Sequence, residues 1–79
     1  MVTPESIEQS IRAGLACERV EVVGDGQHFQ ALVVSNDFAG KSRVQRHQLV
    51  YAAMGGRMRE EVHALSMKTL TPEELASGG

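Results

Sequence analysis

The chain has 79 residues, a formal net charge of −2 and 42% hydrophobic residues. A chain of this length buries only about 60% of its unfolded surface, which excludes a deep active site between two domains. Its longest apolar run, residues 49–54, is far shorter than the roughly 20 residues of a membrane-spanning helix. One cysteine excludes an internal disulfide and a zinc site of four cysteines or of two cysteines with two histidines. Since we also see no secretory signal, we expect a cytoplasmic protein.

The N-terminal part of the chain predicts a helix over about residues 4–15. Thr3 supplies a hydroxyl cap, Pro4 suits the first helical position and Glu5 lies near the positive end of the helix dipole. An apolar residue then recurs at every fourth position, and these residues are Ile7, Ile11 and Leu15. This spacing predicts that one narrow stripe of the helix faces the core.

Two strands joined by a tight turn are predicted next. Residues 18–23 are rich in β-branched side chains, and Gly24-Asp25-Gly26 is typical of a turn. Residues 29–35 become apolar on both faces, which is typical of a central strand. We therefore expect a β-hairpin.

The second half of the chain predicts a loop over 36–41, a helix, a short second helix over about 57–63 and a third strand over 65–70. Ser42 and Gln45 have the spacing of a capping box, and Gly55-Gly56 is suited to end the first of these helices. Thr71-Pro72 repeats the device that opens the chain and predicts a short closing helix. The residues expected to face inward from the two central helices are Val44, His47, Val50, Tyr51, Met54, Met58 and Val62.

The element order predicts an α+β fold. It is helix, strand, strand, helix, helix, strand and short helix, and the simplest way to bury the apolar stripes is a three-stranded mixed sheet with helices packed on one face. We expect one domain over residues 1–79, with a core at about 4–75 and a frayed tail at 76–79.

The common enzyme motifs are absent from the sequence. Four single side chains remain as candidates for metal or redox chemistry. Cys17 follows the end of the first helix, where the helix dipole raises the pKa of a thiol, so we interpret it as structural. His47 lies on the apolar side of its helix, and we expect a packed, hydrogen-bonded core histidine. His28 and His63 lie at the ends of elements, where their rings can face solvent.

A basic segment lies within this acidic chain. No Asp or Glu occurs from Phe38 to Arg59, and five cations do, namely Lys41, Arg43, Arg46, Arg57 and Arg59. Such a segment can contact phosphates or an acidic partner, or it can be a solvated helix face. The charge pattern leaves both interpretations open.

Three motif blocks resemble the signature of the BolA family. They are Phe38-Ala39-Gly40-Lys41-Ser42, then Arg46-His47 leading to Val50, and then the block from His63 to Glu74. The short loop around Gly24-Asp25-Gly26-Gln27-His28-Phe29 resembles the IbaG branch of that family. The resemblance covers about residues 4–75 and implies a fold similar to a type II KH domain.

The resemblance also implies two functions. In the first, the chain is a non-enzymatic partner of a monothiol CGFS glutaredoxin, and the heterodimer holds a [2Fe-2S] cluster with glutathione for iron-sulfur cluster trafficking or iron-linked regulation. The family's histidine ligand matches His63, and His28 is the candidate for a second ligand from the loop between the first two strands. Isolated, the chain would carry no cofactor and be a monomer or weak homodimer.

The alternative implied function is a KH-like, nucleic-acid-binding transcriptional regulator. KH domains grip the nucleic-acid backbone with a GXXG loop, whereas this chain has Gly55-Gly56-Arg57-Met58 between its paired helices. The basic segment from Lys41 to Arg59 still allows weak, salt-dependent contact with phosphates. We expect the same segment to be able to dock an acidic face of the glutaredoxin.

Overall fold

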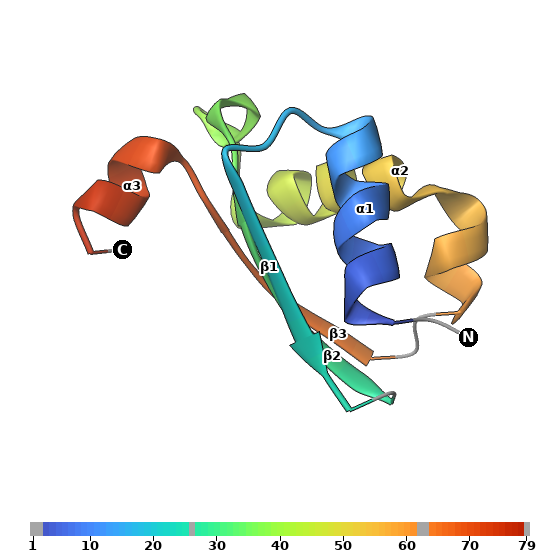
Figure 1. The fold of residues 1–79 in the computed structure, drawn as a ribbon. Helices are drawn as coiled ribbons and strands as arrows, with labels where there is room; N and C mark the ends of the chain where they lie inside the picture. The colour runs from blue at the N-terminus through green and yellow to red at the C-terminus, as the bar shows by residue number, and fades with distance from the viewer. Residues whose placement is uncertain (1–2, 26, 62–63, 79) are drawn as a thin grey trace.

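The computed structural model describes residues 3–25, 27–61 and 64–78, and it leaves the side chains of 56–64 outside the description. The order of elements is the predicted one (Figure 1). They are α1 (Pro4–Gly14), β1 (Arg19–Gly24), β2 (His28–Val34), a 3-10 turn (Asn36–Phe38), α2 (Arg43–Glu61), β3 (Ala64–Leu70) and α3 (Pro72–Ala76).

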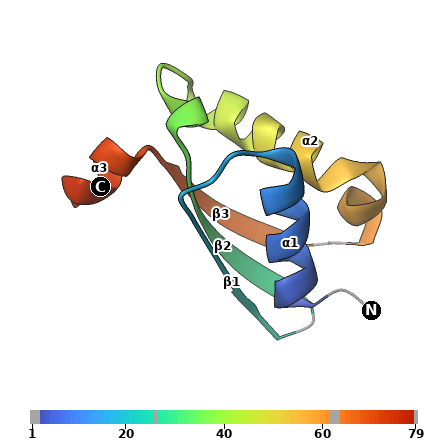
Figure 2. The ribbon, with the colours of Figure 1, turned by 45° about the horizontal axis from the view of Figure 1, so that its top comes forward.

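The sheet has the order β1-β2-β3 and is mixed, as predicted. β1 pairs with β2 antiparallel, and β2 pairs with β3 parallel. The central position of β2 confirms the interpretation of its two apolar faces. α1 and α2 cover one face of the sheet (Figure 2), whereas α3 lies apart from them beyond the end of β3 (Figure 1). The α+β fold is therefore confirmed.

The starts of the three helices follow from local chemistry. Thr3 and Ser6 form a reciprocal capping box at α1, and Thr71 and Glu74 form one at α3. Before α2, the Ser42 backbone N–H donates to Gln45 Oε1 at 2.9 Å, and the Gln45 backbone N–H donates to Ser42 Oγ at 3.2 Å. Each box satisfies backbone N–H groups that have no partner within the helix.

The break in α2 lies at the predicted glycine pair. Gly55 has φ 79° and ψ 165°, a backbone conformation that favours glycine and that separates two helical segments within Arg43–Glu61. The side chains predicted to face inward from the second segment, Met58 and Val62, lie outside the description.

The core lies between the sheet and the two long helices. Ile7 and Ile11 are fully buried and Leu15 is 9% exposed, so the predicted stripe of α1 is confirmed. At the end of α1, Gly14 lies so close to α2 that an added Cβ would be 2.6 Å from Ala53 Cα. The contact between the two helices therefore depends on a residue without a side chain.

The inward placement of Val44 was wrong. This side chain is 65% exposed, whereas Val50 on the same helix is fully buried. Val44 lies in the first turn of α2, before the helix reaches the core. The apolar periodicity of the sequence therefore starts earlier than the part of the helix that is buried.

Candidate functional site

A tight turn positions His28 at the start of β2. Asp25 Oδ1 accepts hydrogen bonds from the backbone N–H groups of Gln27 at 2.9 Å and His28 at 2.8 Å. The bond from His28 is the largest cause that lowers the pKa of the Asp25 carboxyl. An added Cβ on Gly24 would collide with the ring of Phe29, so the turn needs glycine there. The His28 side chain is exposed.

The register of the parallel strands places His28 opposite the start of β3. His28 is the Cα partner of Ala64, the first residue of β3. Ala64 follows His63 in the chain, and His63 itself lies outside the described residues. Within the described ranges, no group of three or more His, Cys, Asp and Glu side chains could hold a metal ion.

The structure places His47 differently from the sequence prediction. The residue is half-buried, and its Nε2 is buried with no hydrogen-bond partner. Burial lowers the pKa of the imidazole, and the nearby Arg43 guanidinium lowers it further. The prediction of a hydrogen-bonded core histidine was therefore wrong at Nε2, because the surrounding side chains cover this nitrogen without placing a hydrogen-bond partner within reach.

The Arg46 guanidinium is engaged in hydrogen bonds within the fold. Its Nε donates to the Lys41 carbonyl at 3.0 Å, and NH1 donates to the Thr69 carbonyl at 3.0 Å and to Glu74 Oε1 at 2.7 Å. The guanidinium also lies 5.9 Å from the centre of the Phe38 ring. These contacts join α2, β3 and α3, so the expectation that Arg46 is available to phosphate is corrected.

The partner of Arg46 is also held tightly. The hydrogen bond from Arg46 is the largest cause that lowers the pKa of Glu74 to about 2, followed by the backbone N–H of Thr71. NH2 of Arg46 adds a second bond to Glu74 Oε2 at 3.2 Å, which makes the pair bidentate. The positive charge of Arg46 is therefore matched by a carboxylate.

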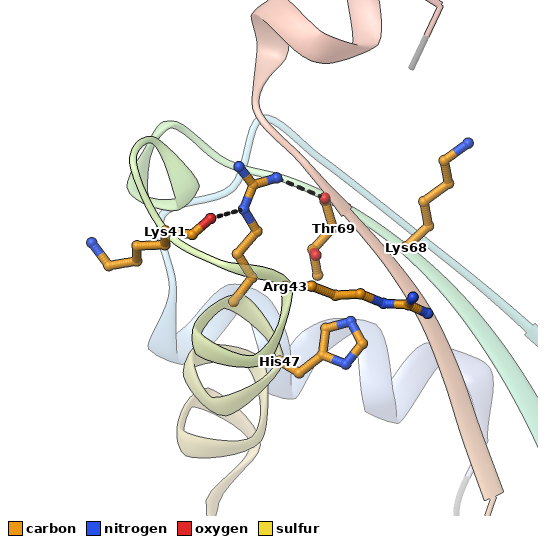
Figure 3. Close-up of a pocket in the computed structure, with 6 residues that line it drawn as sticks. Lys41, Arg43, His47, Lys68 and Thr69 are labelled. Carbon is orange, nitrogen blue, oxygen red and sulfur yellow. Dashed lines mark hydrogen bonds between the residues drawn. The ribbon is translucent and has the colours of Figure 1, made fainter.

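A cavity of about 590 Å³ lies between the start of α2 and β3 (Figure 3). Its lining residues are Lys41, Arg43, Arg46, His47, Lys68 and Thr69. The basic segment of the sequence predicted the first three, but not Lys68, which comes from an edge strand and reaches the same rim. The side chains of Arg57 and Arg59, the other two predicted contacts, lie outside the description.

The comparison with protein families shows which family the chain belongs to. The family model described as BolA-like protein matches residues 2–74. The chain belongs to the BolA family. The predicted resemblance is thereby confirmed over nearly the whole chain.

Individual BolA-family proteins are similar over the same span. Acid stress protein IbaG of Escherichia coli (strain K12) is 38% identical over 71 residues, which cover 89% of this chain and 84% of the relative. The DNA-binding transcriptional regulator BolA of the same strain is 31% identical over 84 residues, covering 94% and 80%. The structure of a BolA homologue from Coxiella burnetii superposes with a TM-score of 0.85 at 47% identity, covering 96% and 99% of the two chains.

The cysteine of this BolA-family chain is packed against the core. Cys17 is half-buried, and burial is the largest cause that raises the pKa of its thiol. The predicted direction is confirmed, but the cause differs, because desolvation and not the helix dipole dominates. None of the helices among the described residues is long and apolar enough to cross a membrane.

Proposed function

We propose that this BolA-family chain is a non-enzymatic partner of a monothiol CGFS glutaredoxin. The two proteins and glutathione hold a [2Fe-2S] cluster between them, for iron-sulfur cluster trafficking or iron-linked regulation. The observation that carries the proposal is the register of β2 and β3, which pairs His28 with Ala64, the chain neighbour of His63. His28 thus lies at the end of the sheet where β3 begins.

The chemistry of the donor set fits a shared cluster. A [2Fe-2S] cluster takes four ligands, and histidine can replace cysteine on one iron. His63 and His28 supply imidazole from this chain, and the glutaredoxin cysteine and glutathione supply thiolates from the other side. The His28 side chain is exposed, and Asp25 fixes the backbone that carries it. Acid weakens binding, since imidazole ligates in its neutral form.

Anaerobic reconstitution tests the proposal. The chain is mixed with a CGFS glutaredoxin, glutathione, iron and sulfide, and the product is followed by visible spectroscopy and gel filtration. We expect a heterodimer whose spectrum differs from that of the glutaredoxin homodimer, and we expect His63→Ala to abolish that difference. We expect His28→Ala to weaken cluster retention. His47→Leu is the control, because it removes a histidine that is not a proposed ligand, and it should leave the spectrum unchanged.

Two results would contradict the proposal. A spectrum identical to that of the glutaredoxin homodimer, with no heterodimer on gel filtration, removes the partnership. A heterodimer whose cluster is unaffected by both His63→Ala and His28→Ala keeps the partnership but removes the assigned ligands.

A second candidate function is nucleic-acid binding. Three cations at one cavity, Lys41, Arg43 and Lys68, make no ion pair within the described residues, and a 31% identical relative is named a DNA-binding regulator. A gel-shift titration at two salt concentrations tests this function. Binding tighter than about 1 μM at physiological salt, lost in Arg43→Gln with Lys68→Gln, would rank it first.

A further inference from the structure

The cavity beside α2 has an unbalanced charge. Its lining contains four cationic side chains and no carboxylate. Glu74 neutralises Arg46 through a bidentate pair, but no ion pair of the described residues involves Lys41, Arg43 or Lys68. Three like charges around one space repel each other, so an anion that enters it gains attraction from all three.

The ring of His47 also lines the cavity, although its Nε2 does not open onto it. Nε2 of His47 is buried and has no partner, and buried polar atoms without a partner are rare in folded proteins. In Figure 3 the Arg43 side chain lies alongside the His47 ring, between α2 and β3, while Lys41 and Lys68 extend to opposite sides. A ligand oxygen in this space could accept from the guanidinium of Arg43.

We propose that the cavity where the ring of His47 lies beside the unpaired guanidinium of Arg43 binds the dianionic phosphate group of a small phosphomonoester. Arg43 presents a fork of N–H donors that matches two phosphate oxygens. Lys41 and Lys68 lie at the rim, from where their flexible ammonium groups can approach the remaining oxygens. Three unpaired cations favour a dianion over the single charge of a backbone phosphodiester.

This site does not depend on the proposed cluster. Lys68 and Thr69 are the Cα partners of Leu32 and Val33, whereas His28 pairs with Ala64 at the other end of the strands. The four residue steps along β3 from Ala64 to Lys68 span roughly 13 Å. Anion binding in the cavity and cluster binding at the hairpin end can therefore succeed or fail separately.

An NMR titration with inorganic phosphate tests the proposal on the isolated chain. The ring signals of His47 are followed at constant ionic strength and about pH 8.5, where the dianion of inorganic phosphate predominates. We expect a saturable shift of the His47 signals and no shift of those of His28. Dimethyl phosphate, which carries the single charge of a nucleic-acid backbone, should bind about tenfold more weakly.

Charge-matched variants locate the site. Arg43→Gln should weaken phosphate binding about tenfold and Lys68→Gln several-fold, whereas Arg12→Gln removes the same charge from α1 and should change nothing.

Three results would overturn the proposal. One is the absence of a saturable shift, and another is equal phosphate affinity in Arg43→Gln and Arg12→Gln. The third is dimethyl phosphate binding as tightly as inorganic phosphate, which would make this a contact for a nucleic-acid backbone.

Discussion

Replacing His47 with leucine should stabilise the fold, although histidine lies there in the middle of the structure. The substitution removes a buried Nε2 that has no hydrogen-bond partner, and an unsatisfied buried polar atom costs about 1–3 kcal/mol. Because the residue as a whole is half-buried, we expect the low end of that range, about 1 kcal/mol. The higher helix propensity of leucine adds a few tenths of a kcal/mol.

Thermal unfolding followed by circular dichroism measures this effect, in a chloride buffer without phosphate. A gain of about 1 kcal/mol raises the Tm of a domain of this size by roughly 4–8 °C. Two valines of the same helix are controls. Val50→Ala, at a fully buried position, should cost about 2 kcal/mol, and Val44→Ala, at a position that is 65% exposed, should stay within about 0.5 kcal/mol.

The pH dependence gives the same substitution a second readout. Burial and Arg43 lower the pKa of His47 below its ordinary 6.5, so the unfolded chain binds this proton more readily than the folded one. Stability due to neutral His47 is therefore complete above about pH 6.5 and declines as the pH falls toward the folded pKa. The advantage of His47→Leu should grow over that window. If His47→Leu lowers the Tm as much as Val50→Ala does, Nε2 does not lack a hydrogen-bond partner in the folded protein.

Three further predictions concern contacts that hold the fold. Glu74→Gln should lower the Tm at neutral pH, because it removes the charge that Arg46 binds, and the difference from the parent should close as the pH falls from 4.5 to about 2; a constant difference in an acid titration would contradict this. Gly14→Ala should cost about 1–2 kcal/mol in urea unfolding despite its better helix propensity, since the added Cβ would lie 2.6 Å from Ala53 Cα; an increase in stability would contradict the close packing. Cys17 should react with iodoacetamide more slowly in the folded than in the unfolded chain at equal pH, because burial raises its pKa; equal rates would remove that cause.

The fold could be predicted because its signals are local. The three capping motifs, the apolar repeat of α1 and the glycine break in α2 each depend on residues within a few positions of one another, and the structure confirms them. The central position of β2 followed from its apolar character on both faces. Val44 failed because periodicity alone does not show where a helix enters the core.

The site could be predicted only in part, because its decisive contacts join distant residues. Glu74 belongs to the capping box of α3, but its second role requires Arg46, 28 positions away. Lys68 lies outside the basic segment and reaches the cavity only because β3 is an edge strand. The burial of His47 Nε2 without a partner depends on how the elements pack, and no spacing in the sequence describes it.

The central claim, a cluster shared with a glutaredoxin, is tested most directly by pulsed electron paramagnetic resonance of the reduced cluster in the purified heterodimer. We predict a strong nitrogen coupling from a coordinated imidazole, which disappears in His63→Ala and persists in His47→Leu. A heterodimer cluster without any nitrogen coupling, or one whose coupling survives both His63→Ala and His28→Ala, would contradict the account.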